Sequence, residues 1–297
     1  YCHRIYAGKD KTSSKLVHIS TWQSIYQLPK KHFEQYKVIL GDEVHTFTAK
    51  SLKTIMQKTT DCPNKFGLTG TLDDAESHHL VLEGLFGSVK KVTTTKQLID
   101  AKQISDLKIM GIVLTYSEKE CIIRDYNEEI KFITEHPQRN NLIRNLSIDL
   151  KGNTLVLFSL IKHGEFLHEL ITEKADVNRK TFFVYGGTDS ETREKIRGIV
   201  EKERDSIVVA SFGVFSTGIN IRNLHNIIFA SPYKSRIRNL QSIGRGLRTH
   251  ESKAGAKLYD IADNFNNNNH TMKHFVKRIG IYNQEEFDYE IIKVNLK

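Results

Sequence analysis

The sequence predicts an α/β protein with two parallel-sheet domains in tandem. Short apolar runs rich in β-branched residues alternate with stretches of helical spacing, as is typical of strands and helices in a parallel sheet. The alternation occurs twice, once on each side of a segment near the middle of the chain. The length of 297 residues suffices for two domains of ordinary size.

The composition favours a nucleic-acid partner. The net charge is +9, and basic residues are spread over both predicted domains, which suits the neutralisation of phosphates, although an ordinary basic surface is the alternative. Three cysteines far apart in the sequence support neither a disulfide framework nor a zinc site, so we expect a protein of the reducing cytoplasm. No apolar run is long enough to cross a membrane, so no membrane partner is expected.

The first predicted strand, residues 16–21, ends in a polar turn. Hydroxyl and amide side chains at a strand-to-helix turn can bond phosphates, so we predict that Thr21 and Gln23 contact a nucleic-acid backbone. A helix N-cap is the alternative for both. For Trp22, which lies between them, we favour an ordinary packing residue.

The second predicted strand, residues 38–40, is short, apolar and expected to be buried. Asp42, Glu43 and His45 follow at its carboxyl end, where ligands bind in open α/β sheets. Asp42 suits Mg²⁺, and Glu43 suits the activation of the water that attacks a γ-phosphate. His45 is a candidate to report the nucleotide state to a neighbouring domain. A strand that ends in a solvated polar turn is the alternative.

A third strand, residues 65–72, follows a helix predicted over about residues 51–60. Two strands with polar tips about 25 residues apart are expected to be neighbours in one parallel sheet. Thr69 and Thr71 lie at the tip of this strand. They are candidates to relay between the acid pair and nucleic acid, and a plain turn is the alternative.

The domain boundaries are predicted from the next change of pattern. We assign residues 1–95 to the first domain, 96–140 to a connecting segment and 141–297 to the second domain. Within the connection, residues 108–114 form the clearest strand. Pro137 precedes a helix that is indicated by apolar residues at helical spacing.

The second domain repeats the strand–helix alternation. The predicted strands are residues 154–158, 180–185, 206–211 and 226–230, and helices are predicted over about 162–172 and 190–204. A helix over 270–281 and an edge strand over 287–296 complete the pattern, and four consecutive asparagines at 266–269 indicate a loop tip.

Two stretches in this domain suit phosphate contacts. Residues 213–220 combine two glycines with hydroxyl residues, which permits close approach of the backbone to a phosphate or ribose. Arg245 and Arg248 are three residues apart, so on a helix they would share a face and reach into a cleft. An arginine finger acting on transition-state charge is one interpretation, and a solvated basic face is the other.

In their order along the chain, these segments resemble the motifs of the superfamily 2 helicases of the DExH type. Residues 21–24 resemble motif Ib, 42–45 motif II, 69–71 motif III, 211–220 motif V and 241–248 motif VI. The resemblance implies two RecA-like domains in tandem and an ATP-dependent DNA helicase or translocase that uses ATP and Mg²⁺.

The resemblance also implies roles for individual residues. Asp42 would be the Mg²⁺ carboxylate and Glu43 the catalytic base, and His45 would act with Gln241 across an interdomain cleft. Arg245 and Arg248 would face the ATP phosphates. Two sets complete the roles: Gly218 and Asn220 would lie at the nucleotide edge, and Thr21, Gln23, Ser159 and Ser211 would track the nucleic-acid backbone.

The partners implied in this way are branched DNA, single-strand/double-strand junctions and RNA–DNA hybrids, bound by a monomer. An RNA helicase of the same superfamily is one alternative. A nucleic-acid-binding module without catalysis is another.

Two departures from the helicase pattern stand out. Many relatives carry Asp where Asn220 stands, and no G-x-x-x-x-G-K-[ST] motif occurs in the sequence. In these helicases the phosphate loop precedes motif II by tens of residues. The resemblance therefore implies the C-terminal part of a longer motor, with the first domain only partly present, and a chain that is inactive by itself.

Overall fold

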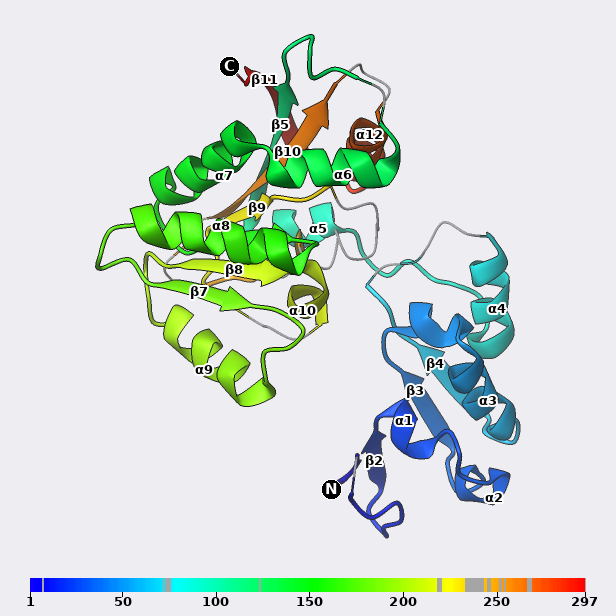
Figure 1. The fold of residues 1–297 in the computed structure, drawn as a ribbon. Coiled ribbons are helices and arrows are strands. Elements are labelled where there is room, and N and C mark those ends of the chain that lie inside the picture. The colour runs from blue at the N-terminus through cyan, green and yellow to red at the C-terminus, as the bar shows by residue number, and fades with distance from the viewer. Residues whose placement is uncertain are drawn as a thin grey trace. The chain divides into compact units, whose positions relative to one another are not determined.

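The computed structural model describes residues 1–6, 8–70, 72, 76–122, 124–217, 221–232, 243–244, 247–250, 253, 255–265 and 269–296. The chain divides into two compact units, Tyr1–Lys91 and Val92–Lys297 (Figure 1). The predicted connecting segment, 96–140, is therefore not separate from the second unit. Its strand pairs on both sides with strands from the end of the chain, and those long-range pairings cannot be inferred from local patterns.

The first unit contains two small parallel sheets among its described residues. β1 (Cys2–Ile5) pairs with β2 (Val17–Ser20), and β3 (Val38–Gly41) pairs with β4 (Asn64–Gly67). The prediction that the second and third strands are parallel neighbours is confirmed. The helices are α1 (Trp22–Ile25), α2 (Lys30–Phe33), the 3₁₀ helix η1 (Val44–Thr48), α3 (Lys50–Lys58) and α4 (Glu76–Phe86).

The prediction that β3 is buried is wrong. Val38 is 52% exposed and Leu40 is 68% exposed. Successive side chains of a strand point to opposite faces, and Gly41, on the other face, is covered by Val44, Phe47 and Phe86. One face of the strand is thus packed, while the face that carries Val38 and Leu40 is open to solvent.

Within its described part, the second unit has one sheet of seven strands in the order β11-β5-β10-β9-β6-β8-β7, in which neighbouring strands are parallel. The strands are β5 (Asp106–Thr115), β6 (Thr154–Phe158), β7 (Thr181–Val184), β8 (Ile207–Ser211), β9 (Asn226–Phe229), β10 (Gly255–Asn264) and β11 (Asp288–Asn295). The prediction of an edge strand at 287–296 is confirmed by β11. The sequence patterns did not indicate β10.

Helices cover both faces of this sheet. They are α5 (Thr95–Asp100), α6 (Tyr126–Glu135), α7 (Pro137–Asp149), α8 (Ile161–Lys174), α9 (Ser190–Val200), α10 (Phe212–Thr217) and α12 (His270–Gln284). Ile133, Ile143 and Leu167 of α6, α7 and α8 pack into one apolar core. Val200, Phe215 and Tyr282, from α9, α10 and α12, pack into the other. The predicted α/β class is confirmed as a doubly wound parallel sheet.

Two buried ion pairs explain how the charged strand β10 fits inside the unit. Nε and Nη2 of Arg278 donate to the Asp260 carboxylate, and Tyr282 donates to it as well. Nε and Nη2 of Arg139 donate in the same way to Asp263. Each carboxylate is thereby satisfied by a side chain from a distant helix, as buried charges require.

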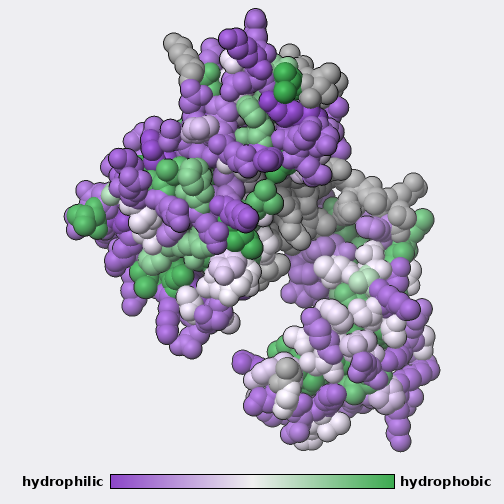
Figure 2. All heavy atoms as spheres, in the orientation of Figure 1, coloured by the Kyte–Doolittle hydropathy of each residue, from purple (hydrophilic) through white to green (hydrophobic). Residues whose placement is uncertain are grey.

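The surface of the second unit is mostly hydrophilic on the face drawn in Figure 2, with small apolar patches between polar side chains. Among the described helices of both units, none combines the length and apolar character that crossing a membrane requires.

Candidate functional site

The acid pair lies in a turn that is fastened to the neighbouring strand. Gly41 and Gly67, the last residues of β3 and β4, are opposite one another in the parallel register. Leu68 N donates to Gly41 O over 2.8 Å, and Val44 N donates to Leu68 O over 3.1 Å. The turn that carries Asp42 and Glu43, here called the acid turn, is therefore held against the turn that follows β4.

The two glycines let η1 fold back over the strand ends. A Cβ atom on Gly41 would lie 2.8 Å from Cγ1 of Val44, and one on Gly67 would lie 3.0 Å from Cγ of Phe86. The distance at Gly41 is too short for a real Cβ atom, and at Gly67 the Phe86 ring would have to give by a few tenths of an ångström. Close packing thus favours glycine at both positions, most strongly at Gly41.

Glu43 has a left-handed backbone, with φ of 50°. Its N–H donates to Oδ1 of Asp42 over 2.9 Å, and its carbonyl accepts a bond of the same length from the Thr46 hydroxyl. This conformation costs a non-glycine residue about 1 kcal/mol or more, and such residues concentrate at functional sites. These contacts fix the Asp42 carboxylate and the Glu43 backbone at an exposed turn.

His45 connects the acid pair to the next turn. Its Nδ1 shares a hydrogen bond of 2.9 Å with Oγ1 of Thr69 and lies 3.3 Å from Oε2 of Glu43. The His45 side chain is only 12% exposed. The structure therefore brings together four of the residues singled out in the sequence, Asp42, Glu43, His45 and Thr69. Thr71 lies outside the described residues.

The acid turn suits Mg²⁺ held together with a phosphate ligand. Among the described residues, no group of three or more His, Cys, Asp or Glu side chains converges as an all-protein metal cage would. Mg²⁺ is commonly bound by one or two carboxylates, with water and phosphate oxygens completing its shell. Asp42 offers an exposed carboxylate with one oxygen oriented by the Glu43 N–H, which fits that mode of binding.

The turn after β2 has a different character from the acid turn. Thr21 occupies the N-cap position of α1, but its hydroxyl bonds to the Ser24 hydroxyl at 2.9 Å rather than to a backbone N–H. Gln23 is exposed. Trp22 is 40% exposed and meets the Tyr26 ring edge-on, so it packs against a neighbouring ring of the first unit while part of its side chain meets solvent.

In the second unit, Ser159 and Ser211 lie at the edge of the sheet where the strands end. Ser211 is the last residue of β8 and is paired with Phe158, the last residue of β6. Ser159 directly follows Phe158. The Ser159 N–H donates to the hydroxyl of Ser231, which follows β9, over 3.1 Å. Adjacent strands therefore present hydroxyl groups together along this edge.

Arg248 lies at the opposite end of the same sheet's strands, where the strands begin. Ser105, which directly precedes β5, donates from its N–H to Leu247 O over 2.7 Å and from its hydroxyl to Arg248 O over 3.2 Å. Just before Arg248, Leu247 N donates to Ile243 O over 3.1 Å. Arg248 is not itself helical, so the helix face that was predicted for Arg245 and Arg248 does not extend to it. Gly218, Asn220, Gln241 and Arg245 lie outside the described residues.

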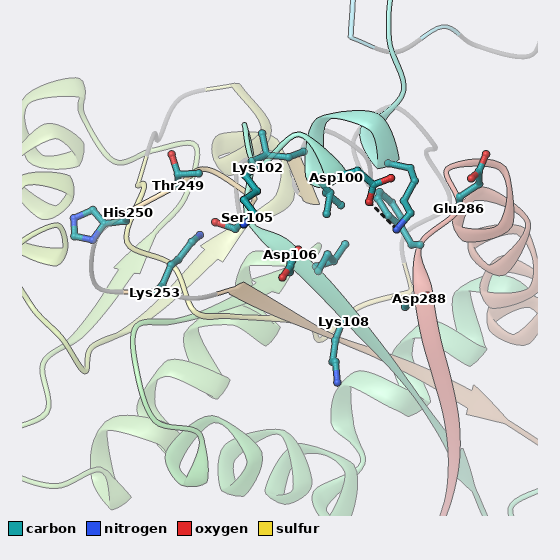
Figure 3. A pocket seen from close by; sticks show the side chains of 15 residues that line it. Asp100, Lys102, Ser105, Asp106, Lys108, Thr249, His250, Lys253, Glu286 and Asp288 are labelled. Atoms are coloured by element: carbon teal, nitrogen blue, oxygen red, sulfur yellow. Dashed lines mark ion pairs between the residues drawn. The ribbon is translucent and has the colours of Figure 1, made fainter.

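A cavity of about 740 Å³ lies beside the Arg248 segment (Figure 3). Ser105 and Asp106 at the start of β5 line it, together with Thr249, His250 and Lys253. The Lys253 ammonium donates to Leu224 O over 3.0 Å, and burial lowers the pKa of Lys253 to about 8. Nothing in the sequence patterns indicated Ser105, Lys253 or the cavity, because they join segments far apart in the chain.

Two protein families match the chain, one within each of its two units. Residues 138–250 match the helicase conserved C-terminal domain, and residues 2–74 match the res subunit of type III restriction enzymes. The first match spans Ser159, Ser211 and Arg248, and the second spans the acid turn and Thr69.

Individual proteins show the same relationship. The chain is 36% identical over 312 residues to the ATP-dependent DNA helicase uvsW of Enterobacteria phage T4, across 98% of this chain and 61% of that protein. The crystal structure of T4 UvsW matches with a TM-score of 0.56 at 35% identity, covering 100% of this chain and 62% of that chain. Saccharomyces cerevisiae Dbp5 bound to RNA and ADP BeF3 shares the fold, with a TM-score of 0.60 at 12% identity over 100% of this chain and 70% of that one. The chain thus spans about three-fifths of the length of the T4 helicase.

Proposed function

The chain belongs to the superfamily 2 helicases, and from that premise we propose that it forms part of an ATP-dependent DNA helicase or translocase that acts on branched DNA. The observation that carries the proposal is the acid turn. Asp42 and Glu43 lie at an exposed turn at the end of β3, where the Glu43 N–H donates to the Asp42 carboxylate, and His45 contacts both Glu43 and Thr69 of the turn after β4.

In this proposal the first unit supplies the groups that act on ATP. Mg²⁺ bound with the nucleotide would neutralise phosphate charge, and Asp42 is the residue that would hold it. Glu43 orients the attacking water and accepts its proton, since its carboxylate contacts His45 but remains about half exposed to solvent at the turn. A movement of Glu43 is transmitted to Thr69 because His45 contacts both side chains.

The second unit contributes charge and nucleic-acid contacts. Arg248 supplies a guanidinium to the ATP phosphates, since arginine stabilises transition-state charge in phosphoryl transfer. Ser159 and Ser211 present hydroxyl groups to the backbone of the nucleic acid along the far edge of the sheet, and Thr21 and Gln23 do so from the first unit. Support for DNA comes from the 36% identity to the T4 DNA helicase and from the net charge of +9.

The test is ATP hydrolysis by the full-length protein with Glu43→Gln. We expect the rate stimulated by forked DNA to fall by about 100-fold or more, as when a general base is removed. Glu34→Gln, at an exposed position of the same unit, is the matched control and should hydrolyse ATP normally. A near-normal rate in Glu43→Gln would refute the assignment.

The substrate is tested with the unaltered protein. We expect forked DNA and RNA–DNA hybrids to stimulate hydrolysis more than an unbranched DNA duplex does. Stronger stimulation by an RNA duplex than by forked DNA would replace the proposal with an RNA helicase of the same superfamily.

A further inference from the structure

We propose that Ser105 is a positioning residue for Arg248. Its side chain, directly before β5, fixes the position of the arginine during ATP hydrolysis. The inference rests on the proposed function of Arg248. It goes beyond that function because Ser105 lies outside the helicase motifs, in a part of the chain for which the sequence predicted only a connection.

Ser105 holds the arginine segment at two successive carbonyl groups. Its N–H donates to Leu247 O over 2.7 Å, and its hydroxyl donates to Arg248 O over 3.2 Å. The residue is only 7% exposed, and 143 positions of sequence separate it from Arg248. Figure 3 shows Ser105 beside the segment that continues into Thr249 and His250.

The support beneath Ser105 is rigid. β5 pairs with β10 on one side and with β11 on the other, starting at Asp106 and Lys108 respectively. A Cβ atom on Gly255 would lie 3.1 Å from Asp106 O, so the start of β5 is in tight contact with β10. Ser105 therefore presents its donors from a fixed point at the edge of the sheet.

The segment that carries Arg248 leaves the apolar core at the point where Ser105 bonds it, so Ile243 and Leu247 form its apolar anchor and Arg248 lies just beyond that anchor. Ile243 and Leu247 are each 1% exposed and belong to the core under the sheet, but Arg248 is only partly buried. The hydroxyl of Ser105 bonds the first carbonyl beyond that anchor. A displacement of about 1 Å in a positioned group can cost about 100-fold in rate, so a bond at this point affects catalysis through placement.

The two hydrogen bonds can be separated by mutation. The bond to Leu247 O uses the backbone N–H, which every residue except proline supplies. Ser105→Ala removes only the bond to Arg248 O and leaves the bond to Leu247 O in place. Ser105→Thr keeps both donors.

The experiment measures kcat and KM for DNA-stimulated ATP hydrolysis in the full-length protein. We expect Ser105→Ala to lower kcat about tenfold with KM unchanged, which corresponds to the loss of one hydrogen bond and some misplacement. Ser105→Thr should restore kcat. Ser117→Ala is the matched control, because the exposed Ser117 bonds Glu120 beyond the other end of β5, and this variant should keep the normal kcat.

Coupling to the arginine is measured with Arg248→Lys, which keeps the charge and leaves a measurable rate. If Ser105 acts through Arg248, Ser105→Ala should lower kcat by less than threefold in the Arg248→Lys background, about a third of its effect in the normal background. The melting temperature of Ser105→Ala should match that of Ser117→Ala.

Three results would overturn the inference. They are a normal kcat in Ser105→Ala, an equal loss of kcat in both Arg248 backgrounds, and an equal loss in Ser105→Ala and Ser105→Thr. A normal rate in Arg248→Ala would instead overturn the proposed function of the arginine itself, so the two failures are distinguishable.

Discussion

In the first unit, strand β3 exposes Val38 and Leu40 to solvent, whereas in the second unit the apolar side chains of β6 are fully buried. The sequences of the two strands are similarly apolar. The difference comes from the surroundings, because β6 lies in the interior of a sheet with helices on both faces, and β3 pairs with β4 and is packed on one face. An apolar run thus predicts a strand, but the layers around it determine burial.

The largest expected difference between the two units is in how much the free energy of unfolding changes when an ion pair is removed. Arg278→Ala leaves the buried Asp260 carboxylate without its charged partner, so we expect the free energy of unfolding of the second unit to fall by about 3–5 kcal/mol. Lys30→Ala removes an exposed pair with Asp61 in the first unit and should leave the urea midpoint unchanged. Hydrogen exchange of peptides from each unit, measured across a urea series, checks both. Equal effects would show that burial does not separate the two units energetically.

The strands themselves offer the next comparison. Leu157→Ala opens a cavity in the core around β6, and we expect a loss of about 2–5 kcal/mol in the free energy of unfolding. Leu40→Ala removes a side chain that already meets water, and we expect a change within about 0.5 kcal/mol. The same exchange experiment reports both values. A large effect of Leu40→Ala would mean that the open face of β3 is covered in solution.

The smallest effects concern pH, where the two units respond in different windows. Burial, then the charges of His18 and Lys11, lower the pKa of His32 from 6.5. The unfolded chain then binds the proton more readily, so the first unit should lose stability as pH falls through 6.5. Burial lowers the pKa of Lys253 from 10.5 to about 8, so the second unit should gain stability as pH rises from about 8 to 10.5.

Melting temperature against pH tests these directions, with His32→Gln and Lys253→Gln as the variants. Each variant should flatten the slope in its own window and leave the slope in the other window as it was. A slope near pH 9 that survives in Lys253→Gln would contradict the assignment to that ammonium group.

Local patterns predicted most of the strands and helices because each depends on residues close together in the chain. β6, β8 and β9 combine apolar and β-branched residues, and α7 begins with Pro137, which was expected to precede it directly. β10 escaped prediction because Asp260 and Asp263 interrupt its apolar pattern. Their partners, Arg278 and Arg139, come from α12 and α7, so the charges are satisfied only once the chain has folded.

Some residues of the candidate site were likewise indicated by local patterns, and others were not. The polar tips after β3 and β4 made Thr69 a candidate to relay between the acid pair and nucleic acid, and its hydroxyl lies 2.9 Å from Nδ1 of His45. The relay itself stays a prediction. No pattern could indicate Ser105, because its role depends on a pairing with Arg248 across most of the second unit. The roles that were assigned to Asp42, Glu43 and Arg248 in ATP hydrolysis stay predictions.

The sequence by itself determined the α/β class, the parallel order of β3 and β4, and the polar residues at the ends of the strands, because those features follow from residues adjacent in the chain. The tertiary structure alone decided which strands are buried, how the charges of β10 are paired, and that Arg248 and Ser159 stand at opposite edges of one sheet. These outcomes depend on contacts between distant segments, which form only when the apolar faces of several elements are buried together.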